Sequence, residues 1–164
     1  MDRQIRKAAI LLLGIWLIII SWITLFNLNY AIAVRIVNGI PFLWIAELFQ
    51  IFQSGRAVLF YVRLVMKGLL INLWMFAPGG FLMPLAFPAF RNGKRVIAAG
   101  LLFSILIESL QFMHGGRVVD IDDVLMNGLG TGLGFCIYQI GLFLIRTATI
   151  GESINSKKRR LAAD

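Results

Sequence analysis

The sequence predicts an all-α integral membrane protein, a bundle of four transmembrane helices that forms a single domain over 1–164. Hydrophobic residues make up 59% of the 164 residues, and charged residues make up only 15%. A soluble domain of this size exposes too much surface to water to carry so few charges. The apolar residues are also gathered into long runs, each bounded by charged or polar residues. These observations exclude an ordinary soluble enzyme, a disordered regulator and a disulfide-framed secreted domain.

The first apolar run predicts a transmembrane helix at 8–26. This run contains no charge and is long enough to cross about 30 Å of hydrocarbon as a helix. Basic residues precede it, as they precede a signal peptide. The run is long for a signal peptide, however, and no small-residue cleavage site follows it. We therefore expect a retained helix.

Three further spans are predicted, at 68–90, 96–112 and 124–145. The first of these is interrupted by proline and glycine, which membrane helices tolerate better than soluble helices do. The second is the shortest and contains Glu108 and Gln111. In the third, Gly130 and Gly134 have the small-xxx-small spacing that lets a helix approach its neighbour closely.

The segment 27–67, between the first two spans, predicts an amphipathic helix that lies in the outer membrane interface. At helical spacing, Ile45 and Phe49 fall on one face, whereas Glu47 and Gln50 fall on another. Helices of this kind lie in the plane of the interface with the apolar face toward the acyl chains. A re-entrant hairpin is the alternative.

The distribution of Lys and Arg predicts that both termini face the cytoplasm. Eleven of the 16 basic residues lie at the N-terminus, in the turn between the second and third spans, and in the basic tail 146–164; five lie on the opposite side. The side with more Lys and Arg is usually cytoplasmic. The segments 27–67 and 113–123 then face outward from a bacterial plasma membrane. The net charge of +8 indicates this orientation and attraction to anionic lipids, rather than a nucleic-acid site.

Polar side chains gather at the outward end of the second, third and fourth spans and in the loop before the fourth. Counted along each helix, those in the spans lie within roughly 6 Å of the outer boundary. The predicted binding residues are Asn72, Glu108, Gln111, Arg117, Asp120, Asp123 and Asn127. Because ionisable groups at this depth are costly and usually mark function, these residues predict an outward-facing polar pocket.

Several of these residues also have a purely structural interpretation. Asp120 or Asp122 can cap the fourth span, since a carboxylate accepts hydrogen bonds from the first amides of a helix. Asn72 and Asn127 can join neighbouring helices through their amides. Both interpretations stay open beside the binding pocket.

The sequence identifies no catalytic residue with a defined reaction. Glu108 and Asp123 are candidates for acid–base chemistry, because an apolar setting raises the pKa of a carboxyl group. We expect no cofactor and no metal, since His114 is the single histidine and Cys136 the single cysteine.

The polar motifs follow an order that resembles the VanZ-like family. The motifs are NGIPF at 38–42, FAPGGF at 76–81, ESLQ at 108–111, RVVDIDD at 117–123 and NGLG at 127–130. The resemblance covers about residues 35–140. The chain departs from the family at Gly79, where a bulky apolar residue is usual between the proline and the following glycine.

The resemblance implies a small bacterial plasma-membrane protein whose namesake is linked to teicoplanin resistance. Expected partners are membrane lipids, with a cell-wall precursor or a lipoglycopeptide as alternatives, and no nucleic acid. Four functions stay open: a pocket that binds such an amphiphile, an enzyme that modifies it with Glu108 as general acid/base, a small proton-coupled transporter, and a structural membrane partner. The oligomeric state stays open as well, a homo-oligomer included.

Overall fold

The computed structural model of the chain describes residues 3–26, 36–54, 58–114 and 118–161. The elements in chain order are α1 (Arg3–Phe26), β1 (Ile36–Asn38), α2 (Leu43–Gln53), α3 (Val58–Ala86), the 3-10 helix η1 (Pro88–Phe90), α4 (Gly93–His114), β2 (Val118–Asp120) and α5 (Ile121–Leu161).

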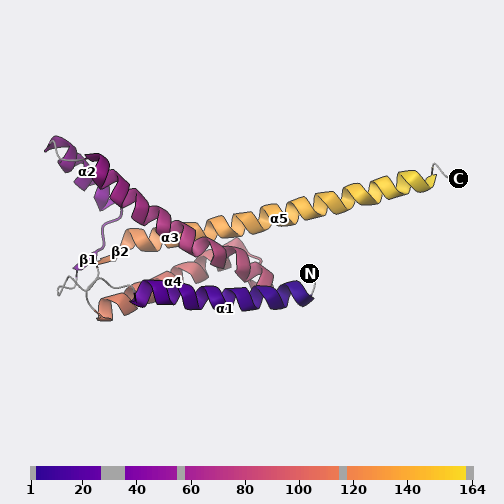
Figure 1. The fold of residues 1–164 in the computed structure, drawn as a ribbon, viewed down its shortest axis with the longest axis horizontal. Coiled ribbons are helices and arrows are strands. Elements are labelled where there is room, and N and C mark those ends of the chain that lie inside the picture. Colours follow the sequence, from indigo (N-terminus) through magenta and orange to yellow (C-terminus); the bar gives the residue numbers. More distant parts are fainter. Residues whose placement is uncertain (1–2, 27–35, 55–57, 115–117, 162–164) are drawn as a thin grey trace.

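Four of the helices, α1, α3, α4 and α5, are long and apolar enough to cross a membrane. This confirms the predicted all-α membrane bundle. The four helices run in alternating directions, so both termini lie at one end and α2, β1 and β2 lie at the other (Figure 1). At the terminal end, Arg6 of α1 donates from Nε to the carbonyl oxygen of Ala86 at the end of α3, at 3.1 Å.

All four membrane-length helices begin before the apolar runs that predicted them, and α3 and α5 differ most from the prediction. α3 begins at Val58, ahead of the expected start at Gly68, because Arg63 and Lys67 are exposed on its surface and do not interrupt it. α5 continues through the tail to Leu161 and has 41 residues, which is about 60 Å of helix. Charged residues in the sequence indicate where a helix leaves the hydrocarbon. They do not indicate where the helix itself begins or ends.

The outer segment between α1 and α3 contains α2, which packs beside the first turns of α3 as a helical hairpin (Figure 1). Its apolar residues Ile45, Phe49 and Phe52 are exposed, as expected of an interfacial helix. The segment also contains β1, which pairs in parallel with β2 so that Asn38 stands opposite Asp120. This strand pair was not predicted, because three residues are too few to produce an alternating pattern.

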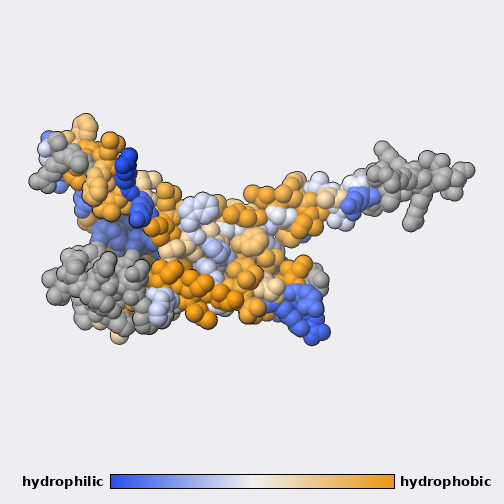
Figure 2. All heavy atoms as spheres, in the orientation of Figure 1, coloured by the Kyte–Doolittle hydropathy of each residue, from blue (hydrophilic) through white to orange (hydrophobic). Residues whose placement is uncertain are grey.

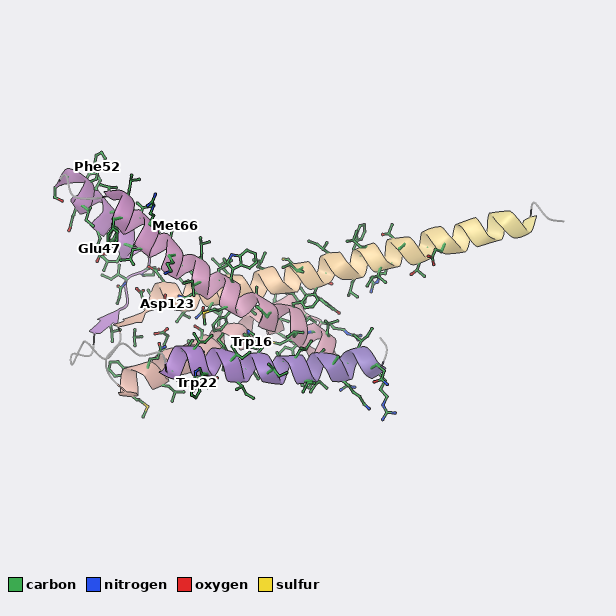
Figure 3. All side chains as sticks on the ribbon, in the orientation of Figure 1. Trp16, Trp22, Glu47, Phe52, Met66 and Asp123 are labelled. Atoms are coloured by element: carbon green, nitrogen blue, oxygen red, sulfur yellow. The ribbon has the colours of Figure 1, made fainter. Side chains whose placement is uncertain are left out.

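The core of the bundle is centred on Trp16 of α1, labelled in Figure 3. Its ring packs against Phe76 and Phe103, with centroids 6.0 and 5.9 Å away. Its Nε1 donates to the carbonyl oxygen of Met75 at 2.9 Å. A Cβ on Gly79 would lie 2.5 Å from the Trp16 ring. The indole therefore fills the space beside the residue at which the sequence departs from the VanZ-like motif.

The tightest helix contact is the crossing of α3 and α5. A Cβ built on Gly80 or Gly134 would lie 1.9 Å from a backbone carbonyl oxygen of the other helix, and one on Gly130 would lie 2.1 Å away. Backbone atoms cannot move aside as a side chain can, so only glycine fits at these positions. The close approach predicted from Gly130 and Gly134 is confirmed.

Candidate binding site

The outer end of the molecule is organised around the first residues of α5. Asp120 precedes the helix and caps it, because its Oδ1 accepts the amide N–H of Asp122 at 2.9 Å. The same oxygen accepts Nδ2 of Asn38 at 3.1 Å, which ties the cap to β1. The capping interpretation therefore holds for Asp120.

Asp122 fixes the start of α2. Its carboxylate oxygens accept the amide N–H of Phe42 at 2.9 and 3.1 Å, and its side chain is only 4% exposed. Phe42 has a left-handed backbone with φ 60°, which is unfavourable for a bulky residue. The Asp122 carboxylate thus holds both the strained turn and the helix that follows it.

A polar cavity of about 570 Å³ lies between β1, α2 and the first residues of α3 and α5. Its polar lining residues are Asn38, Glu47, Tyr61, Asp120, Asp122 and Asp123. Tyr61 donates its hydroxyl hydrogen to Oε2 of Glu47 and so links α3 to α2. Figure 3 labels Glu47 on α2 and Asp123 on α5 at this end of the molecule. Among the residues that the structure describes, this lining contains no Lys or Arg.

Asn72 supports this cavity from α3. Its Nδ2 donates to Oδ1 of Asp123, and Asp123 faces the cavity. The hydrogen bond orients the carboxylate without neutralising it. The bond joins α3 to α5, so it also fits the structural interpretation in which Asn72 links neighbouring helices.

An apolar groove of about 620 Å³ continues from the polar cavity along α5. Leu69, Leu101 and Leu129 line it, and Cys136 lies near its far end. The polar cavity and the groove share Trp44, Leu69 and Asp122 as lining residues. The two spaces are therefore adjacent, with the polar one at the outer end and the apolar one along the helices.

Glu108 lies in a different cavity. It is 6% exposed and lines a space of about 430 Å³ together with Asn38 and Asp120. Asn38 and Asp120 also line the polar cavity, so their hydrogen-bonded pair stands between the two spaces. Glu108 and Asp123, the candidates for acid–base chemistry, do not line a common cavity.

Gln111 and Asn127 join helices rather than line a cavity. Nε2 of Gln111 donates to the carbonyl oxygen of Thr24 on α1 at 2.7 Å. Nδ2 of Asn127 donates to Oγ of Ser104 on α4 at 2.8 Å. All three side chains, Ser104, Gln111 and Asn127, are at least 95% buried. Hydrogen bonds of this kind stabilise helix contacts in membranes.

The predicted site is thus divided among several places. Asn72, Asp120 and Asp123 gather at the polar cavity, Glu108 lies beside it, and Arg117 lies outside the described residues. Glu47, Tyr61 and Trp44 were missed as site residues, although the amphipathic pattern placed Glu47 on the polar face of an outer helix. Among the described residues, no group of three His, Cys, Asp or Glu side chains could hold a metal ion.

The surface around this site separates polar from apolar regions. Figure 2 shows apolar residues over the middle of the bundle, and hydrophilic residues beside the N-terminus and at the base of the α2–α3 hairpin. The second hydrophilic region lies at the end that holds the polar cavity. The apolar surface over the middle of the bundle is typical of helices that cross a membrane.

A known family model matches most of the chain. The model of a family described as VanZ/LLP1 matches residues 12–144. This range includes the elements that line both cavities. No match was found among curated proteins or among solved structures.

Proposed function

Because the chain belongs to the VanZ/LLP1 family and is a multi-pass membrane protein, we propose that it binds an amphiphile of the bacterial envelope. The headgroup of the amphiphile lies in the polar cavity, and one of its hydrocarbon chains lies in the apolar groove. An envelope lipid, a lipid-linked cell-wall precursor and a lipoglycopeptide antibiotic all have this two-part chemistry. A role in teicoplanin resistance follows if the third of these is the ligand.

The observation that carries the proposal is that the polar cavity and the apolar groove adjoin. Trp44, Leu69 and Asp122 belong to both linings. A soluble ligand would gain nothing from the groove, and a pure hydrocarbon would leave the carboxylates unmatched. An amphiphile satisfies both, since apolar surface gains by leaving water and hydrogen-bonding groups gain partners.

The chemistry of the polar cavity favours a headgroup that donates hydrogen bonds. Glu47, Asp122 and Asp123 present carboxylate oxygens, and each oxygen can accept more than one hydrogen bond. A protonated amine, a hydroxyl group or an amide N–H matches them. Arg117, which was predicted to meet a phosphate or carboxylate, lies outside the described residues.

We propose further that this end of the molecule faces outward. The basic residues at the N-terminus and in the α3–α4 turn lie at the opposite end, which favours a cytoplasmic position for that end. The polar cavity is then reached from the outer interface. Tagging each terminus with a reporter that is active on one side only measures this directly.

The test compares the lipids retained by purified variants. Gly132 lines the groove, and its Cβ would meet only Ile97 at an ordinary 3.6 Å. Gly132→Leu therefore fills the groove without disturbing the helix contact, and Gly141→Leu is its control, because nothing lies within 4 Å of a Cβ at Gly141. Glu47→Gln removes a cavity charge, and Glu152→Gln is the matching change on the exposed part of α5.

Mass spectrometry of the retained lipids gives the readout. We expect wild-type protein to hold one lipid class above its share in the membrane. Gly132→Leu and Glu47→Gln should lose this enrichment, whereas both controls should keep it. Equal lipid profiles for all five proteins would contradict the proposal.

A further inference from the structure

The indole of Trp44 lies at the boundary between the polar cavity and the apolar groove. It lines both spaces and also faces Tyr61 and Met66 of α3. It belongs to the first turn of α2, close behind Phe42, whose amide is held by Asp122. The outer end of the site therefore fixes where this indole lies.

The Nε1 of Trp44 is a donor for which the described residues supply no acceptor. The atom is shielded from solvent, and no acceptor for it exists among the residues that the structure describes. Buried indole N–H groups usually have a hydrogen-bond partner. Trp16 follows that rule, since its Nε1 donates to the carbonyl oxygen of Met75 at 2.9 Å. The contrast marks Trp44 as a donor available to a ligand.

We infer that Trp44 Nε1 donates a hydrogen bond to the acyl carbonyl oxygen of the bound amphiphile. The inference rests on the proposed function. An amphiphile with its chain in the groove and its headgroup beside Glu47 places the linkage between them at the shared boundary, where Trp44, Leu69 and Asp122 lie. In an ester- or amide-linked lipid, the carbonyl is the first polar group next to the chain. Protein atoms enclose Nε1 in this structure, so the inferred hydrogen bond requires the indole to turn toward the cavity.

Two lipids that differ only at this carbonyl test the inference. Diacyl phosphatidylethanolamine has ester carbonyls, and dialkyl phosphatidylethanolamine has ether links without them; headgroup and chain length are the same. Both are titrated into the full-length protein in detergent, and lipid-bound protein is counted by native mass spectrometry. The ammonium headgroup is chosen because it can donate to the cavity carboxylates.

Wild-type protein should bind the diacyl lipid about three- to tenfold more tightly than the dialkyl lipid, the ratio expected for one hydrogen bond. Trp44→Phe removes the N–H and keeps an aromatic ring, so it should bind both lipids with the affinity that wild type has for the dialkyl lipid. Trp74→Phe is the control, because Trp74 is 61% exposed on α3 and lines neither space. It should discriminate as wild type does.

Equal affinity of wild type for the two lipids would overturn the inference, and this comparison needs no variant to fold. An equal loss of both lipids in Trp44→Phe would also overturn it, because the indole would then act through packing. If wild type binds neither lipid and retains no other amphiphile, the proposed function itself fails. If wild type binds the diacyl and dialkyl lipids equally, only the inferred role of Trp44 is contradicted, and the proposed function stands.

Discussion

The α3–α5 crossing and the outer end of the molecule are built in opposite ways. At the crossing, glycines bring two backbones together and leave no space between them. At the outer end, side-chain hydrogen bonds join the elements instead, such as those of Asp122 with the Phe42 amide and of Asn72 with Asp123. The space between those elements forms the polar cavity.

The difference shows how a small membrane protein can combine a rigid bundle with an open site. Close backbone packing stabilises helices inside a bilayer, where burial of apolar surface gives no advantage over lipid. A cavity at the interface needs space between its walls instead of close packing. Hydrogen bonds to backbone amides keep those walls in place. Changes at the crossing should therefore affect stability, and changes at the outer end should affect local order and binding.

The largest effect is expected at the crossing. A Cβ on Gly134 would lie 1.9 Å from the Ala77 carbonyl oxygen, so Gly134→Ala forces the two helices apart. We expect a loss of about 3 kcal/mol in unfolding free energy, at the upper end for an overpacked core. Reversible unfolding in mixed micelles measures the loss. Gly141→Ala, on the same helix with open space around it, is the control; equal stability of the two variants would refute the tight crossing.

The second effect is local and lies at the outer end. Asp122→Ala leaves the Phe42 amide without its acceptor, at a cost of about 1–3 kcal/mol. Hydrogen exchange should become faster in α2 and stay unchanged in the transmembrane part of α5. Asp122→Asn keeps an acceptor oxygen and should exchange at nearly the wild-type rate. If Asp122→Ala leaves exchange in α2 unaltered, the carboxylate does not hold this helix.

The third effect separates a helix contact from the binding site. Ser104→Ala removes the acceptor of Asn127, and interhelical hydrogen bonds of this kind contribute roughly 0.6 kcal/mol on average. Stability should therefore fall by about that amount, and lipid retention should not change. A selective loss of lipid without any loss of stability would assign Asn127 to the site instead.

The smallest effect on stability is expected at Tyr61. Tyr61→Phe removes a hydrogen bond to an exposed Glu47, so unfolding free energy should change by less than about 0.5 kcal/mol. Binding should weaken, because Glu47 is no longer oriented toward the cavity. Native mass spectrometry with phosphatidylethanolamine measures the change. Tyr138→Phe, on the buried face of α5, should leave binding unaffected; equal binding by both variants would remove Tyr61 from the site.

Helical periodicity predicted the inward faces well. Ser104, Glu108 and Gln111 recur along α4 at the spacing of one helix face, and all three are buried. The small residues at Gly130 and Gly134 likewise predicted the close contact with α3. These features depend on the spacing of residues along one helix, and this spacing can be read directly from the sequence.

Contacts between distant segments could not be predicted in the same way. The pairing of Asn38 with Asp120 and of Glu47 with Tyr61 depends on how the outer segment folds back over α5 and α3. Depth along a helix suggested one pocket for Glu108 and Asp123, whereas the strand pair lies between their cavities. Depth fixes a level in the membrane but leaves open the direction in which a side chain points.

The central claim is that a lipid chain occupies the groove beside α5 while its headgroup lies in the polar cavity. Photo-crosslinking with phosphatidylethanolamine that carries a diazirine on its acyl chain tests this most directly. Adducts should concentrate on Leu101, Leu129 and Cys136 in the groove. Leu11 and Ile18 of α1 are more than 60% exposed and report general contact with bulk lipid. Adducts spread evenly over α1 and the groove would contradict a specific lipid site.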